Sequence, residues 1–250
     1  MPSTGCRRAP AACLVATVLL AGCGGGGSKS SKSSSTSPAA TTPASTTTTT
    51  SQAQADKDKA QRIVLAAADV PGFTVDVANA STKNADLEAA ANACVNNNPL
   101  LVRLGEATDP RGASSPDFTM GETLTVGSAA TFGETEDEAR SAIAALSAPA
   151  FTGCFSDALA VELRKNPSLT NVTVTTSRLP TVAAGDQSIG YRSTARLRVS
   201  GTAVTFYFDF TFVRTGRAVA VLSDVTVGNA YPEADRTRLA AAVAGRMAGP

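Results

Sequence analysis

The chain has 250 residues, 43% of them apolar, which suits one globular domain with additional segments. Four of its 22 basic residues, Arg7, Arg8, Lys29 and Lys32, lie in N-terminal segments, so the remaining 18 face 21 acidic residues. A net charge of −3 gives no electrostatic footprint for nucleic acid. Because histidine is absent, Ser-His-Asp and Cys-His catalysis and most zinc sites are excluded. We expect no enzyme, no metal and no cofactor.

Residues 1–22 have the layout of a secretory signal. Arg7 and Arg8 precede the uncharged apolar stretch 9–21, which is too short to span a bilayer as a helix. The stretch closes as LAGC at residues 20–23, which resembles the bacterial lipobox. That resemblance implies cleavage before Cys23, diacylglycerol on its sulfur, palmitate on its new amino terminus, and anchoring to the outer side of the cell membrane. The alternative is an ordinary cleavage site beside a free cysteine.

Residues 23–54 are predicted to join the lipid to the folded body. Residues 24–54 contain no Leu, Ile, Val or aromatic residue, so they cannot bury enough apolar surface to offset the entropy of ordering. We expect a disordered Ser/Thr/Gly-rich tether with a root-mean-square span of about 30 Å. The single extracytoplasmic domain is then residues 55–250.

The five cysteines divide between these segments. Cys6 and Cys13 leave with the signal and Cys23 carries the lipid, so Cys94 and Cys154 remain together in an oxidising compartment. We predict a disulfide between Cys94 and Cys154. The alternative is a pair of buried free thiols.

The first half of the body mixes helices with strands. Thr135 and Glu138 form a capping-box pattern, which makes the acidic residues near them more typical of a helix start than of catalysis. Hydrophobic periodicity predicts, in chain order, a helix over 60–68, a strand over 73–77, a helix over 86–97, a strand over 119–132, and helices over 135–147 and 151–166.

The second half carries the clearest fold signal, four alternating stretches over 171–178, 187–199, 202–214 and 217–227. Two-residue turns at Ser200-Gly201 and Thr215-Gly216 would place Tyr191 opposite Phe210 and Phe212 opposite Val219, with all apolar pairs on one face.

A helix over 231–247, with Leu239, Val243 and Met247 along one stripe, is expected to cover that face. The fold class is α+β, a twisted antiparallel sheet (a C-terminal meander) with helices packed on one face.

The same registers gather polar side chains on the opposite face of the sheet. Guanidinium groups and paired acids could bind an anionic or polyhydroxylated ligand there. The alternative is a solvated face whose ion pairs stabilise the sheet slightly. We favour this alternative, because the spacing of residues alone gives no evidence for a binding site. The candidate ligand face consists of Arg192, Arg196, Tyr207, Asp209 and Asp224, with Arg192 opposite Asp209 and Tyr207 opposite Asp224.

Several stretches carry a family resemblance: the LAGC lipobox and tether, AADVPGF, GDQSIGYR and FVRTGRAVAVL. Together they look like actinobacterial extracytoplasmic lipoproteins and, more remotely, the extracellular sensor domain of the mycobacterial Ser/Thr kinase PknH. This resemblance implies a twisted sheet with helices, a cleft and a sensing role for a small ligand. That sensor domain has two disulfides, whereas this body can form one, so no binding residue is carried over.

These observations favour a non-enzymatic lipoprotein whose domain binds a small ligand or an envelope protein. Two alternatives stay open. One is a lipid carrier, in which the apolar sheet face bounds a cavity. The other is a cell-envelope hydrolase that uses a carboxylate pair, which needs only proximity of two acids in space.

Overall fold

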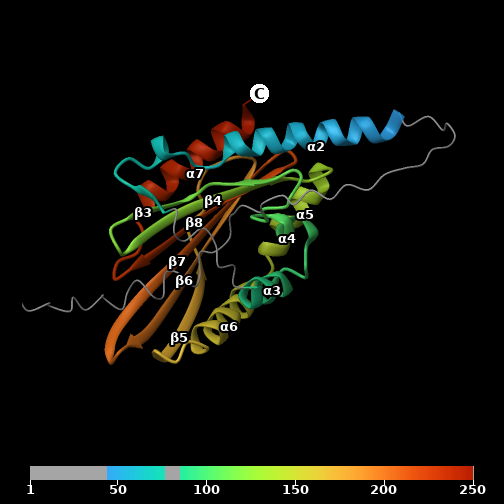
Figure 1. The fold of residues 1–250 in the computed structure, drawn as a ribbon. Coiled ribbons are helices and arrows are strands. Elements are labelled where there is room, and N and C mark those ends of the chain that lie inside the picture. The colour runs from blue at the N-terminus through green and yellow to red at the C-terminus, as the bar shows by residue number, and fades with distance from the viewer. Residues whose placement is uncertain (1–43, 77–84, 250) are drawn as a thin grey trace, which may run out of the picture.

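The computed structural model describes residues 44–76 and 85–249 (Figure 1). The predicted signal, Cys23 and the tether up to residue 43 lie outside the described residues. The described residues form one antiparallel sheet in the strand order β1-β3-β4-β8-β7-β6-β5, with β2 paired to β4. The strands are β1 Thr74–Asp76, β2 Ala113–Ser114, β3 Asp117–Met120, β4 Leu124–Phe132, β5 Leu169–Arg178, β6 Gln187–Val199, β7 Thr202–Thr215 and β8 Ala218–Val227.

Helices accompany the sheet, which confirms the predicted α+β class with a twisted antiparallel sheet (Figure 1). The helices are α2 Ala44–Ile63, α3 Ala85–Cys94, α4 Pro99–Arg103, α5 Glu136–Leu146, α6 Phe151–Arg164 and α7 Glu233–Ala248, with a 3-10 turn at Ala67–Asp69. Among the described residues no single helix is long and apolar enough to cross a membrane; α5 and α6 reach that length only as a pair, across a bend of 71°.

The helices cover both faces of the sheet, not one as the sequence predicted. Helices α2 and α7 lie on one face, which we call the α7 side, and α3 to α6 lie on the other, the α6 side (Figure 1). The physical reason is visible in β8, where the unbroken apolar run AVAVL supplies buried residues to both faces. Such runs are typical of strands that are buried on both sides.

The C-terminal helix covers a different face from the one expected. Leu239, Val243 and Met247 are buried as predicted, but they pack against the β7 and β8 residues Val213 and Leu222 on the α7 side. The phenylalanine-rich face is instead covered by α5 and α6.

The two hairpins of the meander test the predicted registers. The turn at Ser200-Gly201 is confirmed, with Tyr191 opposite Phe210 and Arg192 opposite Asp209. The second turn lies one residue later, at Gly216-Arg217, so the β7–β8 register differs by two residues from the prediction. A shift of two leaves every side chain on its predicted face, because side chains alternate with a period of two. The corrected pairs are Phe212 with Val221, Tyr207 with Thr226, and Asp209 with Asp224.

Two further elements differ from the prediction. The strand expected over 119–132 is the hairpin β3–β4, which turns through Gly121 at a φ of +61°. Helix α2 begins at Ala44 and therefore includes residues 44–54, which the composition assigned to the tether. The helix is fixed to the body at Asp56, whose buried carboxylate pairs with Arg111 and Arg217, each at 2.8 Å.

Candidate functional site

The structure joins Cys94 to Cys154, which confirms the predicted disulfide. The bond ties the last residue of α3 to the first turn of α6, with 5.6 Å between the two Cα atoms. Among the described residues of α3 whose side chains are placed, none is fully buried, so this helix packs on the domain only loosely by itself. The disulfide is therefore its firmest attachment.

Four of the five residues proposed as a ligand face lie together on the α7 side. The guanidinium of Arg192 donates to both carboxylate oxygens of Asp209, at 2.8 and 2.6 Å, and its charge lies 5.6 Å from the centre of the Tyr207 ring. Such a bidentate ion pair is among the stronger polar contacts in proteins. Asp224 lies opposite Asp209 on β8. Arg196 is exposed further along β6 and does not join them.

Arg192, Tyr207, Asp209 and Asp224 form a polar cluster on the α7 side. Helix α7 adds to it a residue that the sequence analysis did not assign to this face. Arg236 is buried, and its Nη1 lies 3.5 Å from Asp209 Oδ2. The sequence predicted the C-terminal helix that contains Arg236, but it placed that helix on the opposite face of the sheet. Oδ1 of Asp224 has no hydrogen-bond partner among the described residues. Burial, and then the charge of Asp209, raises the pKa of Asp224 to about 8.

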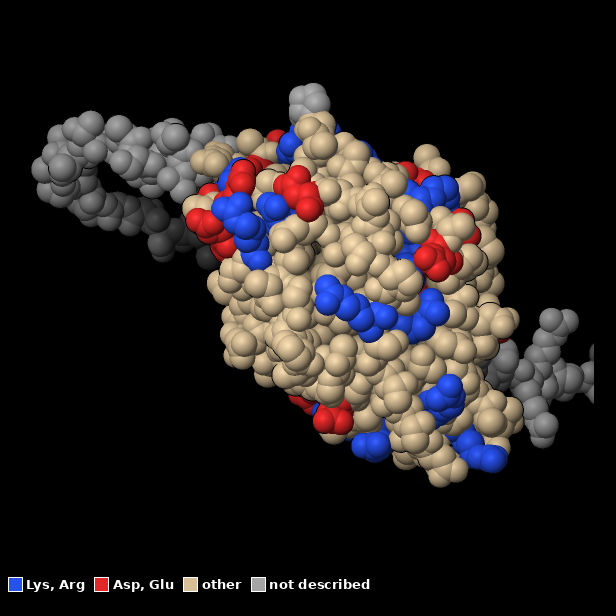
Figure 2. Space-filling model, turned by 180° about the vertical axis from the view of Figure 1, so that it is seen from behind, with Lys and Arg blue, Asp and Glu red and all other residues tan. Residues whose placement is uncertain are grey.

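The two acids of the polar cluster are closed off from solvent. The side chain of Asp209 is fully buried, and Asp224 is 5% exposed beneath α7. Arg192 uses its guanidinium fork on Asp209, whereas Arg236 contacts Asp209 through Nη1 alone, and its buried Nε has no hydrogen-bond partner among the described residues. No group of three or more Cys, Asp or Glu side chains in the described part of the chain is placed to hold a metal ion. Charges elsewhere are scattered; the surface seen from behind is largely uncharged (Figure 2).

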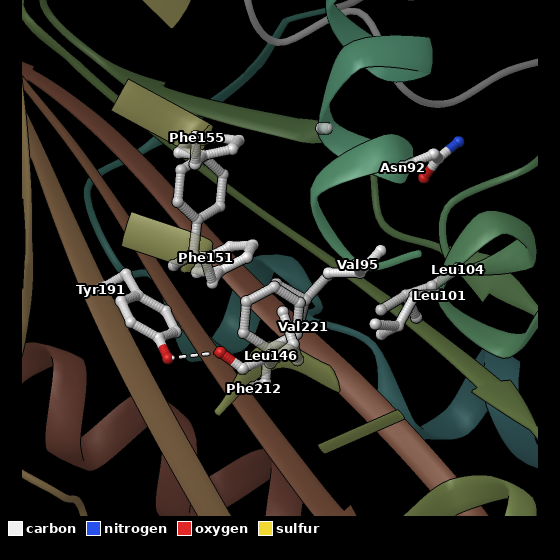
Figure 3. A pocket seen from close by; sticks show the side chains of 12 residues that line it. Asn92, Val95, Leu101, Leu104, Leu146, Phe151, Phe155, Tyr191, Phe212 and Val221 are labelled. Carbon is white, nitrogen blue, oxygen red and sulfur yellow. Dashed lines mark hydrogen bonds between the residues drawn. The ribbon is translucent and has the colours of Figure 1, made fainter. Parts of the chain in front are cut away.

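A second feature lies on the α6 side: an apolar pocket of about 210 Å³ between the sheet and the helices α3 to α6 (Figure 3). Residues from seven elements converge on it. Its lining consists of Ala91, Asn92 and Val95; Leu101 and Leu104; Leu146; Phe151 and Phe155; and Tyr191, Phe210, Phe212 and Val221. The pocket was not predicted as a site, although its strand residues were assigned to the apolar face.

The disulfide joins two helices that line the pocket, although neither cysteine is itself a lining residue. Cys94 lies between the lining residues Asn92 and Val95, and Cys154 lies between Phe151 and Phe155. The covalent bond therefore holds α3, which supplies Ala91 and Asn92, beside α6, which supplies Phe151 and Phe155.

The polar groups of the pocket are few. The Tyr191 hydroxyl donates to the Leu146 carbonyl at 2.7 Å, so it is directed at the wall and is already satisfied (Figure 3). Burial raises the pKa of Tyr191, and the positive charge of Arg178 opposes that rise. Asn92 supplies a neutral amide, and no charged side chain is among the lining residues. The pocket can therefore hold an apolar group, and it offers no nucleophile and base.

Comparison with known proteins gives little further guidance. No protein-family model matches the chain, and no curated protein matches it. Among solved structures, the crystal structure of the extracellular domain of PknH from Mycobacterium tuberculosis is similar with 12% identity and a TM-score of 0.28. The similarity covers 53% of this chain and 58% of that one, little more than half of either.

Proposed function

We propose that this protein is a lipid-anchored extracytoplasmic lipoprotein whose single domain binds a small apolar ligand without catalysing a reaction. The lipid on Cys23 would hold it at the outer side of the membrane, as the LAGC sequence and the preceding apolar stretch suggest. The residues up to 43, which include the lipidation site, are separate in sequence from the pocket residues. Anchoring and binding are therefore tested separately.

The observation that supports binding is the pocket of about 210 Å³ on the α6 side. Ligand sites are concave and mostly apolar, with few polar groups. This pocket is partly open to solvent and lined mainly by apolar side chains, so a ligand could enter it and bury apolar surface there. The disulfide links α3 to α6, two of the helices that line the pocket.

The two alternative functions have weaker support. A pocket of about 210 Å³ is smaller than the roughly 300 to 1,000 Å³ of sites for drug-sized ligands, so a carrier for a whole lipid is not favoured. A hydrolase with two acids would need carboxyl groups that reach a substrate. Asp209 and Asp224, which lie side by side, are both buried beneath α7.

The direct test fills the pocket from α3. Ala91 lines the pocket, whereas Ala93 on the same helix is exposed, so Ala91→Phe and Ala93→Phe introduce the same ring in two different places. Both are made in the full chain carrying Cys23→Ala, so that no acyl chain competes for the probe. The disulfide is kept intact, and the probe is toluene, a single ring with one methyl group, followed by chemical-shift titration.

We expect the parent and Ala93→Phe to bind the probe with equal affinity, and Ala91→Phe to lose at least roughly tenfold in affinity, since the ring occupies the space of the ligand. Unfolding by urea shows that all three proteins are folded. If the folded parent does not bind the probe, or if both variants bind it equally, the proposal is overturned. Binding of a protein partner would then be the favoured function.

A further inference from the structure

We infer that the pocket selects an uncharged ligand with a single aromatic ring, and this inference rests on the proposed function. It follows from three properties of the pocket: the concentration of aromatic side chains in its wall, the absence of charge, and its volume. Each of these properties excludes a different class of compound.

Aromatic residues are scarce in this chain, yet they gather at the pocket. The sequence has nine Phe, three Tyr and no Trp, and five of these twelve residues line this one site. Three contacts link the rings into an arc. Tyr191 and Phe151 lie 4.7 Å apart between ring centres, Phe151 and Phe155 lie 5.6 Å apart nearly parallel, and Phe155 meets Phe210 edge-on at 5.6 Å.

An arc of this kind favours another ring over an aliphatic chain of equal volume. Aromatic rings attract one another in offset-stacked and edge-to-face arrangements with centres about 4.5 to 7 Å apart, beyond the gain from buried area alone. A planar ring also has little conformational freedom to lose on binding, whereas a flexible acyl chain loses freedom about each of its bonds.

The lining excludes an ionised group inside the pocket. None of the twelve lining residues is charged, and the hydroxyl of Tyr191 is already engaged with the Leu146 carbonyl. A carboxylate or ammonium placed there would lose its water without gaining a partner, which is costly. Asn92 is the remaining polar side chain of the lining, and its amide is directed away from the aromatic arc (Figure 3).

The volume sets the size of the ligand. An apolar cavity of about 150 Å³ accommodates benzene, so the pocket, at about 210 Å³, has space for one ring with a short substituent. Toluene is therefore a suitable probe. Methylcyclohexane has the same carbon skeleton without aromaticity, and benzoate has the same ring with a negative charge.

The experiment measures the affinity of these three probes for the full chain carrying Cys23→Ala, with the disulfide intact, by chemical-shift titration. We expect toluene to bind roughly threefold or more tightly than methylcyclohexane, and benzoate to bind at least roughly a hundredfold more weakly than toluene. Phe155→Leu keeps the wall apolar but removes a ring, and it should abolish the preference for toluene. Phe208→Leu, buried on the same side of the sheet outside the pocket, should retain the preference.

The outcomes separate this inference from the proposed function. Methylcyclohexane binding as tightly as toluene, or benzoate binding comparably, would overturn the ligand class while leaving a functional pocket. Loss of the preference in both leucine variants would also overturn it, because a general loosening of the domain would then be the cause. No binding of any probe, or binding that Ala91→Phe does not weaken, would overturn the proposed function itself.

Discussion

Asp209 and Asp224 lie directly opposite each other on β7 and β8, and both carboxyl groups are buried. The Asp209 carboxylate is held by Arg192, whereas burial and the charge of Asp209 raise the pKa of Asp224 to about 8. At neutral pH the pair therefore carries one proton, on Asp224. Asp224 remains neutral chiefly because burial disfavours its charged form, and the negative charge of Asp209 adds to that effect.

The proton on Asp224 makes the stability of the domain depend on pH. An unfolded Asp releases its proton near pH 4, but Asp224 in the folded domain holds it up to about pH 8, so the folded state binds more protons between these values. Stability must then fall as pH rises through that window. Between pH 6 and pH 8 we expect the free energy of unfolding to decrease by about 2 kcal/mol, measured by urea denaturation.

The interval from pH 6 to pH 8 isolates Asp224. Burial also raises the pKa of Asp117, but only to about 6, so its effect falls mainly below the interval. The chain has no histidine, and both cysteines of the body are in the disulfide. Asp224→Asn should remove the slope, because the amide is neutral at every pH. An unchanged slope in Asp224→Asn, or no slope in the parent, would show that this carboxyl is already ionised at pH 6.

Arg192 and Arg196 lie on the same strand and were assigned to the same face, but only Arg192 is paired with a buried charge. Removing it leaves the Asp209 carboxylate buried with a single distant partner. We expect Arg192→Ala to lower the free energy of unfolding by about 3 kcal/mol, and Arg196→Ala to change it by less than about 0.5 kcal/mol. Equal effects in urea denaturation would mean that the bidentate pair does not stabilise the fold.

The strands of the C-terminal meander could be predicted from the sequence, because local residue patterns define its strands and turns. Turn residues and two-residue alternation define the β6–β7 register, and Ser200 and Gly201 both have the positive φ that such a turn requires. The second turn was misplaced because Thr215-Gly216 and Gly216-Arg217 both contain the glycine that a turn favours. Gly216 alone does not decide between them. The predicted faces of the side chains were still correct, because the register was shifted by two residues and side chains alternate with a period of two.

The faces of the sheet and the pocket depend on information that is not local. Val213 and the run AVAVL in β8 are sequence signals of a second buried face that the prediction of one covered face did not use, and which helix covers which face depends on how the chain crosses the sheet. The pocket exists because α3, α4, α5 and α6 leave space above Phe212 and Val221. No spacing of residues in the sequence encodes a space of that kind, so the pocket had to be found in the structure.

The disulfide should be required for ligand affinity as well as for stability. Replacing Cys94 and Cys154 together by Ser frees α3, whose remaining links include an exposed ion pair of Asp86 with Lys165. Exposed ion pairs contribute little. We expect about 4 kcal/mol lower stability on the chain-entropy model, and weaker binding of toluene at temperatures where the variant stays folded. Unchanged affinity in the folded variant would mean that α3 holds its place in the wall without the bond.

Cys23 should determine where the protein is found in the cell. Two or three acyl chains anchor a protein stably, whereas a polypeptide without them has no such attachment. In a bacterium with a lipoprotein pathway fed an alkyne analogue of palmitate, the parent should be labelled and pellet with membranes. Cys23→Ala should be unlabelled, and Cys13→Ala, which alters a cysteine in the predicted signal, should behave as the parent. Unlabelled but membrane-bound Cys23→Ala would show that the apolar stretch itself retains the protein, and labelled Cys23→Ala would show that the lipid is on another residue.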